Sequence, residues 1–196
     1  MIDKYFSFQY SEHPLWKEIV QKRIELRDLN YQWFIGYNLF SLVWWLELIL
    51  FIAVWFIWWK LVDKSRLVEI VAYGLMVSIL ATIIDLAGAN FVLWGYPIMP
   101  VPLMPPLFIV NVGLLPVVYM LVYQYFSSFQ SFTKAVLIMA VIFAYAAEPL
   151  AVWLGIYELT NWRYSYSFPI YIALALFLKW VMTKILAKQN SNQNFK

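Results

Sequence analysis

The sequence predicts an all-α integral membrane protein, a bundle of five transmembrane helices with an N-terminal amphipathic interfacial helix. Of its 196 residues, 64% are hydrophobic and 13% are charged, whereas a soluble domain carries about 25% charged residues. The charges are clustered, which leaves apolar runs longer than the roughly 18 residues that a membrane-crossing helix needs. Aromatic residues make up 20% of the chain, and many lie near the ends of these runs, where rings can sit among lipid headgroups.

Residues 1–35 form the only long polar portion and are predicted to contain the amphipathic helix. Pro14 suits a first helical turn, and a helix starting there gathers its apolar side chains on one face. These side chains are Leu15, Trp16, Ile19, Val20 and Ile24. We expect this helix to lie on the membrane surface or to cover the bundle.

Residues 36–187 are expected to form one domain of five spans, followed by a polar tail at 188–196. The spans are predicted at about 36–59, 67–94, 105–126, 133–156 and 168–187. A proline-dense turn, YPIMPVPLMPP, separates the second span from the third, because proline lacks the N–H that a continuous helix requires. This turn has no charge, so we expect it to fold back into the interface or the bundle mouth. Pro116 and Pro149 predict kinks within the third and fourth spans.

The distribution of basic residues predicts a protein of the cytoplasmic membrane with its N-terminus outside and its C-terminus inside. Five crossings place the termini on opposite sides, and cytoplasmic loops carry an excess of Lys and Arg. The side of the C-terminus holds Lys60, Lys64, Arg66 and Lys134, whereas the short loops of the other side hold only Arg163. Basic residues of the N-terminal segment weigh against this orientation. No short charged stretch with a short apolar core opens the chain, so we expect no cleavable signal peptide.

Three carboxylic acids, Glu47, Asp85 and Glu148, lie inside the predicted spans. With a helical rise of 1.5 Å per residue, Asp85 and Glu148 lie about 14 Å below the aromatic ends of their helices. A charge at such depth costs about 2.5–3.5 kcal/mol on insertion scales, so these residues are expected to face the bundle interior and to mark a functional site. We expect Asp85 to be protonated and to neighbour Glu148. The alternative is that the acids only lock helix packing through hydrogen bonds.

The candidate site has a polar and an aromatic part. The polar candidates are Glu47, Asp85, Asn90, Asn111 and Glu148, and the aromatic lining candidates are Trp44, Trp94, Tyr96, Trp153 and Trp162. An aromatic-walled pocket would suit an apolar or a cationic ligand. Packing in the core is the alternative for Trp44 and Trp153, because aromatic rings bury a large area in any interior.

Several chemistries are excluded or disfavoured by composition. The chain has no Cys, which rules out disulfides, thiolate nucleophiles and cysteine metal sites. His13 is the only histidine and lies outside every apolar run, which leaves little for a histidine metal site or a Ser-His triad. We therefore predict no metal and no cofactor. The net charge of +3 is too small and dispersed to indicate a nucleic-acid partner.

Three segments in order resemble a family of small multipass membrane proteins from spore-forming Gram-positive bacteria. They are DLAGANFVLWGYP, the MPP…N…LLPV run from Met104 to Val117, and AEPLAVWLGIYELTNWRYSYSFPIYI. The resemblance covers roughly residues 35–185. It implies an integral protein of the cytoplasmic membrane and no particular reaction, because that family has no established activity.

A more distant resemblance is to the membrane-embedded carotenoid (lycopene) cyclases. Those proteins combine an intramembrane acid, a following Trp and Tyr, and a later proline–carboxylate motif, which Asp85, Trp94 and Tyr96 match loosely. The later motif is reversed here, since the carboxylate of Glu148 precedes the proline. The twin acids of the cyclases are missing after Pro106, where Asn111 is the nearest polar candidate.

Three functions from different classes are compatible with these features. The first is binding of a lipid-like ligand or a membrane partner through an interior cavity lined by Asp85, Glu148 and aromatic residues. The second is a small transporter or channel subunit coupled to protons or cations, because membrane proton relays use such acids. The third is an intramembrane acid/base enzyme on an apolar, isoprenoid-like substrate; it ranks last because no nucleophile accompanies the acids. The expected partners are membrane lipid and a second copy of the chain or another membrane protein.

Overall fold

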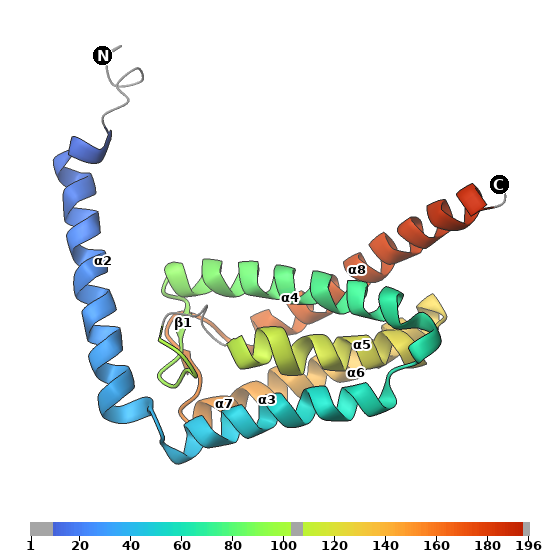
Figure 1. Cartoon of the computed structure of the whole chain (residues 1–196), viewed down its shortest axis with the longest axis horizontal. Helices are drawn as coiled ribbons and strands as arrows, with labels where there is room; N and C mark the ends of the chain where they lie inside the picture. The colour runs from blue at the N-terminus through green and yellow to red at the C-terminus, as the bar shows by residue number, and fades with distance from the viewer. Residues whose placement is uncertain (1–9, 103–107, 194–196) are drawn as a thin grey trace, which may run out of the picture.

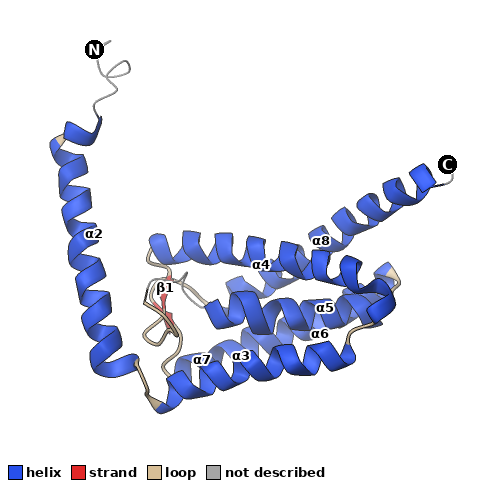
Figure 2. Cartoon of the chain, in the orientation of Figure 1, coloured by secondary structure: helices blue, strands red, loops and turns tan. Residues whose placement is uncertain are grey.

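The computed structural model describes residues 10–102 and 108–193, and this part of the chain is almost entirely helical (Figure 2). The α-helices are α2 (Pro14–Trp33), α3 (Leu42–Leu61), α4 (Leu67–Asn90), α5 (Leu115–Tyr125), α6 (Phe129–Ile142), α7 (Glu148–Trp153) and α8 (Tyr164–Gln193). The short elements are the 3₁₀ turns η1 (Tyr10–Glu12) and η3 (Lys64–Arg66), the π-helical turns η2 (Phe34–Asn38), η4 (Val110–Leu114) and η5 (Phe143–Ala147), and the strands β1 (Trp94–Gly95) and β2 (Glu158–Leu159). The predicted all-α class is confirmed.

Four helical stretches are long and apolar enough to cross a membrane. They are Leu42–Leu61, Lys64–Asn90, Phe129–Trp153 and Tyr164–Gln189. Only 17% to 28% of the most apolar window in each stretch is buried, so most of the apolar surface faces outward. Such a surface suits lipid as the surrounding medium. A shorter apolar helix, Val110–Tyr125, occupies the place of the third predicted span, and the predicted start of that span, at residues 105–107, lies outside the described residues.

The first two long helices are shorter than their predicted spans, for a conformational reason. Phe40 and Val92 have φ angles of 63° and 55°, a left-handed conformation that a right-handed helix cannot contain. The first helix therefore begins at Leu42, where the Ser41 hydroxyl accepts a hydrogen bond from the Trp44 N–H as an N-cap. The second ends at Asn90 and not at residue 94.

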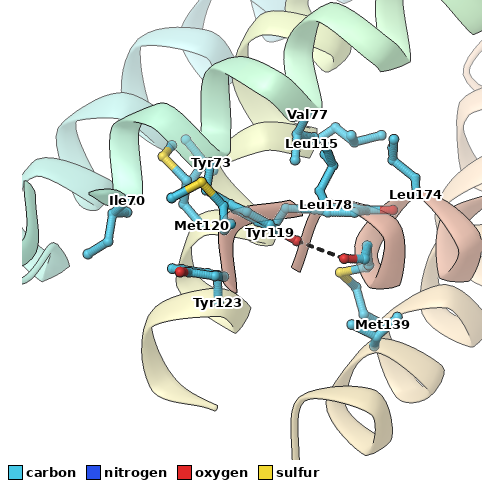
Figure 3. Close-up of a cluster of buried hydrophobic side chains, with 14 of the residues drawn as sticks. Ile70, Tyr73, Val77, Leu115, Tyr119, Met120, Tyr123, Met139, Leu174 and Leu178 are labelled. Carbon is cyan, nitrogen blue, oxygen red and sulfur yellow. Dashed lines mark hydrogen bonds between the residues drawn. The ribbon is translucent and has the colours of Figure 1, made fainter. Parts of the chain in front are cut away.

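The hydrophobic core fills the middle of the bundle, where α4, α5 and α8 pack together. Figure 3 shows tyrosines of α4 and α5 gathered beside leucines of α8. The rings of Tyr73 and Tyr123 stack with centroids 4.3 Å apart. The Tyr119 hydroxyl donates to the Tyr171 carbonyl oxygen at 2.8 Å, which ties α5 to α8. This core is solidly filled by large side chains.

The two ends of the bundle differ in what they carry (Figure 1). One end holds β1 and the base of α2, and we call it the loop end. The opposite end holds the α3–α4 and α5–α6 connections and the outgoing part of α8, and we call it the tail end. Helix α2 stands apart and runs across the long axis of the bundle, and none of its residues is buried. It therefore does not cover the bundle, which was one of the two places expected for it.

Candidate functional site

A cavity of about 290 Å³ lies at the loop end, bounded by α3, α4, α5, α7 and α8. Three carboxylates line it, from Glu47, Asp85 and Glu148, and most of the remaining wall is apolar or aromatic. The other lining residues are Leu50, Ala81, Ile84, Trp94, Tyr96, Ile109, Val110, Asn111, Leu114, Leu115, Phe143, Ala147, Leu150, Ala151, Leu154, Ile156, Tyr157, Trp162, Ser167, Ile170, Tyr171 and Leu174. The three acids expected to face the bundle interior thus line one cavity.

Asp85 accepts hydrogen bonds from three neutral donors. The Trp94 indole N–H donates to Oδ1 at 3.0 Å, and the Tyr96 hydroxyl donates to the same oxygen. The Asn111 amide donates to Oδ2 at 2.9 Å. Two of these donors are N–H groups, which cannot accept a hydrogen bond from a protonated acid. The contacts therefore satisfy Asp85 as a carboxylate and do not require the proton expected on it from the sequence.

Gly88 lets Trp94 reach Asp85. It lies three residues after Asp85 on α4, and the Trp94 ring packs directly against its backbone, so a Cβ atom at position 88 would overlap the ring. The chain then turns back on itself through residues 91–93, which the Leu93 N–H to Gly88 carbonyl bond of 3.0 Å secures. A glycine at this position is therefore part of how the donor is positioned.

Glu148 is held by donors from α8. The Tyr171 hydroxyl donates to Oε1 at 2.7 Å, and the Ser167 hydroxyl donates to Oε2 at 3.1 Å. The Trp162 indole N–H donates in turn to the Ser167 oxygen at 2.9 Å. Ser167 and Tyr171 were missing from the sequence prediction, although their four-residue spacing on an apolar helix places two hydroxyls on one face.

The groups around the two acids touch each other across the cavity mouth. The Trp94 and Trp162 rings meet edge to face with centroids 4.9 Å apart, and Tyr96 stacks on Tyr157 at 5.5 Å. Strands β1 and β2 pair antiparallel beneath these rings, with Trp94 opposite Leu159. The two loops therefore form one lid, in which the donors to Asp85 contact those that serve Glu148.

Two prolines set the backbone that presents Asn111 and Glu148. Proline has no N–H for the carbonyl four residues earlier, and a helix can accommodate this by widening to a π-turn. Such a turn precedes each proline: the Leu115 N–H bonds the Val110 carbonyl in η4, and the Glu148 N–H bonds the Phe143 carbonyl in η5. The kinks predicted at Pro116 and Pro149 thus take the form of π-turns, which bring Asn111 and Glu148 to the cavity wall.

Glu47, from α3, is the least satisfied of the three acids. Its side chain belongs to a residue that is only 5% exposed, and its Oε2 atom has no hydrogen-bond partner among the described residues. Within residues 10–102 and 108–193, no group of three or more His, Cys, Asp or Glu side chains lies close enough to hold one metal ion. The three carboxylates therefore do not converge on one point.

Three predicted site residues lie outside the cavity. Trp153 is 80% exposed on the outer face of α7, and Asn90 is exposed, donating to the Leu86 carbonyl at 2.7 Å. The Trp44 indole donates to the Pro100 carbonyl at 3.1 Å. The structure places none of these three residues at the cavity, and a tryptophan or asparagine in an apolar run carries no sign of which helical face turns inward.

Trp44 instead belongs to a group of side-chain donors, from the N-terminal part of the chain, that hold the proline-rich turn in place. The Trp33 indole donates to the Pro97 carbonyl at 2.7 Å, and the Asn38 amide donates to the Met99 carbonyl at 2.9 Å. The turn offers few N–H groups but retains its carbonyls, and donors from the N-terminal part of the chain occupy them. This agrees with the expectation that the turn folds back at the bundle mouth.

The lid tyrosines Tyr96 and Tyr157 keep their phenol protons to a higher pH than an exposed tyrosine does. Burial raises the pKa of Tyr96, and the charge of Asp85 raises it further. Burial also raises the pKa of Tyr157, with added contributions from the charges of Glu148 and Asp85. Neutral phenols can keep donating to a carboxylate without adding charge to the cavity.

Comparison with family models, curated proteins and solved structures finds no match to this chain. The resemblances drawn from the sequence stay predictions. The chemical content of the site is therefore the basis for its function: an apolar cavity with three acids, two of them held by neutral donors.

Proposed function

We propose that this chain is a five-span protein of the cytoplasmic membrane that binds a lipid-like ligand in the loop-end cavity. The observation that carries the proposal is the cavity itself, which combines apolar walls with the few, converging polar groups around Asp85 and Glu148. Ligand pockets have this composition. Deeply placed acids in a membrane protein also mark functional sites by default.

The size of the cavity indicates how much of a ligand it takes. Its volume of about 290 Å³ is at the lower end of the roughly 300–1,000 Å³ that small-molecule pockets occupy. A head group and the first part of an alkyl chain would fill it. The rest of the chain would extend into the surrounding bilayer, which makes membrane lipid the natural source of the ligand.

The proposed topology places the cavity near the outer surface. Val110–Tyr125 supplies the fifth crossing, and the basic loop residues Lys60, Lys64, Arg66 and Lys134 put the tail end in the cytoplasm. The loop end, with the N-terminus, is then outside. Helix α2 runs across the bundle axis, so it would lie along the outer membrane surface with its apolar face in the headgroup region.

Transport ranks below binding because of what lies between the two ends. The tail-side half of the bundle is filled by side chains that are almost completely buried, including Tyr73, Tyr119 and Phe132. An ion entering the cavity would meet this packed core, in which the Tyr73 and Tyr119 hydroxyls are already bonded to backbone carbonyls of α8. The cavity is thus better suited to holding a molecule than to passing one.

Acid/base catalysis is the remaining alternative, and one observation favours it. Asp85 and Glu148 face the same cavity but have different donors, an indole, a phenol and an amide for one, two hydroxyls for the other. Unequal environments can divide acid and base roles between two carboxyls. An enzyme would release a changed product, whereas a binding protein would return its ligand unaltered.

The proposal is tested by filling the cavity. Ala147 lines the cavity, while Ala146 beside it is exposed on the outer face. The protein is purified in mild detergent as wild type, Ala147→Phe and Ala146→Phe, and co-purifying lipids are extracted and quantified by mass spectrometry. We expect a stoichiometric lipid with the wild type and with Ala146→Phe, and its loss from Ala147→Phe. Equal lipid on all three folded proteins, or on none, would contradict binding in this cavity.

A further inference from the structure

The charged side chains that line the cavity are all acidic. Its lining includes three carboxylates and, among the described residues, no Lys, Arg or His side chain. The described ion pairs lie elsewhere: three involve residues of α2, and the fourth joins Arg66 and Glu69 near the tail end. Buried charges are unfavourable unless a partner compensates them. The described residues therefore provide no cation at this site.

The three acids differ in how far the protein already satisfies them with hydrogen-bond donors. Asp85 has three donors and Glu148 has two, so the protein satisfies them through neutral groups. Glu47 is 95% buried as a residue, faces the same cavity, and its Oε2 atom is unpartnered within the described chain. A buried polar atom without a partner is uncommon in folded proteins and calls for an explanation.

We infer, resting on the proposed function, that the ligand is an amphiphile with a primary amine head and that Glu47 pairs with its ammonium group. An ammonium supplies three N–H donors and a positive charge at once. It can therefore donate to the unpartnered oxygen of Glu47 and also balance the negative charge of the cavity. An anionic head would add a fourth negative group to the same cavity. The lid rings of Tyr96 and Tyr157 offer aromatic faces that favour a cation as well.

A metal ion meets these observations less well than an organic cation. No group of three potential ligands in residues 10–102 and 108–193 could enclose one ion, whereas a metal bound by protein oxygens needs several of them close together. An amine on an alkyl chain needs only one carboxylate for its head and uses the apolar wall for its chain. The separation of the acids thus fits a ligand of some length.

The test compares three probes that share a decyl chain and differ in the head: decylamine, decanol and decanoic acid. Binding to the full-length protein in neutral phosphatidylcholine nanodiscs is measured by titration calorimetry, with empty nanodiscs subtracted. We expect decylamine to bind about tenfold or more tightly than decanol, since a charge-assisted hydrogen bond replaces a neutral one. Decanoic acid is expected to bind weakest.

Two variants assign the effect to Glu47. Glu47→Gln is expected to remove the preference for the amine, so that decylamine and decanol bind with similar affinity. Glu158→Gln removes an exposed carboxylate from β2 at the same end of the molecule, and it is expected to keep the full preference for the amine. Retained decanol binding shows that the Glu47 variant still forms the cavity.

The outcomes separate the two proposals. If wild type binds decanol as tightly as decylamine, the amine inference is overturned while ligand binding stands. If the amine preference survives Glu47→Gln, Glu47 is not the counter-ion. If no decyl probe binds above the empty-nanodisc level, the proposed function fails first. Should Glu47→Gln not fold, the ranking of the three probes on the wild type still decides the head chemistry.

Discussion

Helix α4 carries a carboxylate at each end, and the two have opposite surroundings. Glu69, near the tail end, accepts from Arg66 at 2.8 Å and from the Tyr123 hydroxyl at 2.5 Å. The Lys179 ammonium lies over the Tyr123 ring, 4.3 Å from its centroid. We call these four residues the ion-pair cluster. Asp85, sixteen residues further on and so about 24 Å away, has only neutral donors and faces a cavity.

The difference teaches how one helix can combine a charge-balanced, packed region with an open one. In the ion-pair cluster the negative charge is balanced by cations of the same chain and the surrounding space is filled. At the cavity the charge is left unbalanced and the space is left open, which removes stabilising contacts but retains capacity for a ligand. Functional sites commonly reduce stability in this way.

The largest expected effect contrasts two glycines of α4. Gly88→Ala should lower the free energy of unfolding by about 3 kcal/mol, because the added methyl group meets the rigid Trp94 ring. Gly74→Ala at the core meets the flexible thioether of Met120, which can move aside, and should cost about 1 kcal/mol. Chemical unfolding in detergent micelles measures both. Gly36→Ala, where a Cβ atom meets nothing within 4 Å, is the control.

If Gly74→Ala proves the more harmful of the two, the lid is less tightly built than the core packing around Met120. The same measurement therefore ranks the rigidity of the two regions. It also reports on the site, since a displaced Trp94 no longer donates to Asp85, and ligand binding should weaken in Gly88→Ala alone.

The second prediction concerns the ion-pair cluster. Glu69→Gln leaves Arg66 and Lys179 without their anion, and we expect a loss of about 2 kcal/mol, between the values for surface and buried pairs because Arg66 and Glu69 are 34% and 18% exposed in their side chains. The free energy of unfolding of Glu69→Gln, Lys179→Met and the double variant gives the coupling. Additive losses would show that Lys179 does not interact with Glu69 and contributes to stability through packing.

The third prediction applies the same amide replacement at the cavity. Asp85→Asn keeps one acceptor oxygen and loses the other, so we expect a loss of about 1 kcal/mol. Glu47→Gln removes a charge with an unpartnered oxygen and should leave stability equal or slightly higher. Thermal unfolding in mild detergent measures both variants and Glu148→Gln. A marked loss in all three would mean that the acids serve packing, and the binding and relay hypotheses would then fail.

The smallest expected effect is a loss of stability at alkaline pH. Burial, reinforced by Asp85, raises the pKa of Tyr96 above that of an unfolded tyrosine, so this phenol contributes stability that is present below about pH 10 and lost as the pH rises beyond it. Absorbance at alkaline pH should show Tyr96 ionising after the exposed tyrosines. Tyr157 and other buried tyrosines also ionise late, so the Tyr96→Phe variant should lose one tyrosine's share of the late component and none of the early one. An early component missing from the variant instead would contradict a buried Tyr96.

The sequence was most informative at charged residues and prolines, because both are energetically costly within an apolar helix. Asp85 and Glu148 could be assigned to the interior because an acid in an apolar run has few other places to go. Trp94, Tyr96 and Asn111 were named as candidates through the loose resemblance to the carotenoid cyclases. The order and number of apolar segments were likewise visible in hydropathy alone.

The remaining features depend on tertiary structure that hydropathy does not encode. Trp153, in α7, faces outward, whereas Trp162, in the loop before α8, lies in the lid, and residue type alone does not separate the two. Positive φ angles at Phe40 and Val92 shorten two helices at residues without a glycine or proline signal. The unpartnered oxygen of Glu47 depends on what its neighbours lack, and no pattern in the chain reports that.

The edge-to-face contact of Trp94 and Trp162 has a thermodynamic consequence. Asp85, Trp94, Trp162, Ser167 and Glu148 form an unbroken series of contacts, and the β1–β2 pair holds its centre together. A ligand that displaces one indole must disturb the donor of the other acid as well. The two carboxylates are then coupled, and occupancy at one would be felt as a change of affinity at the other, by the same factor in both directions.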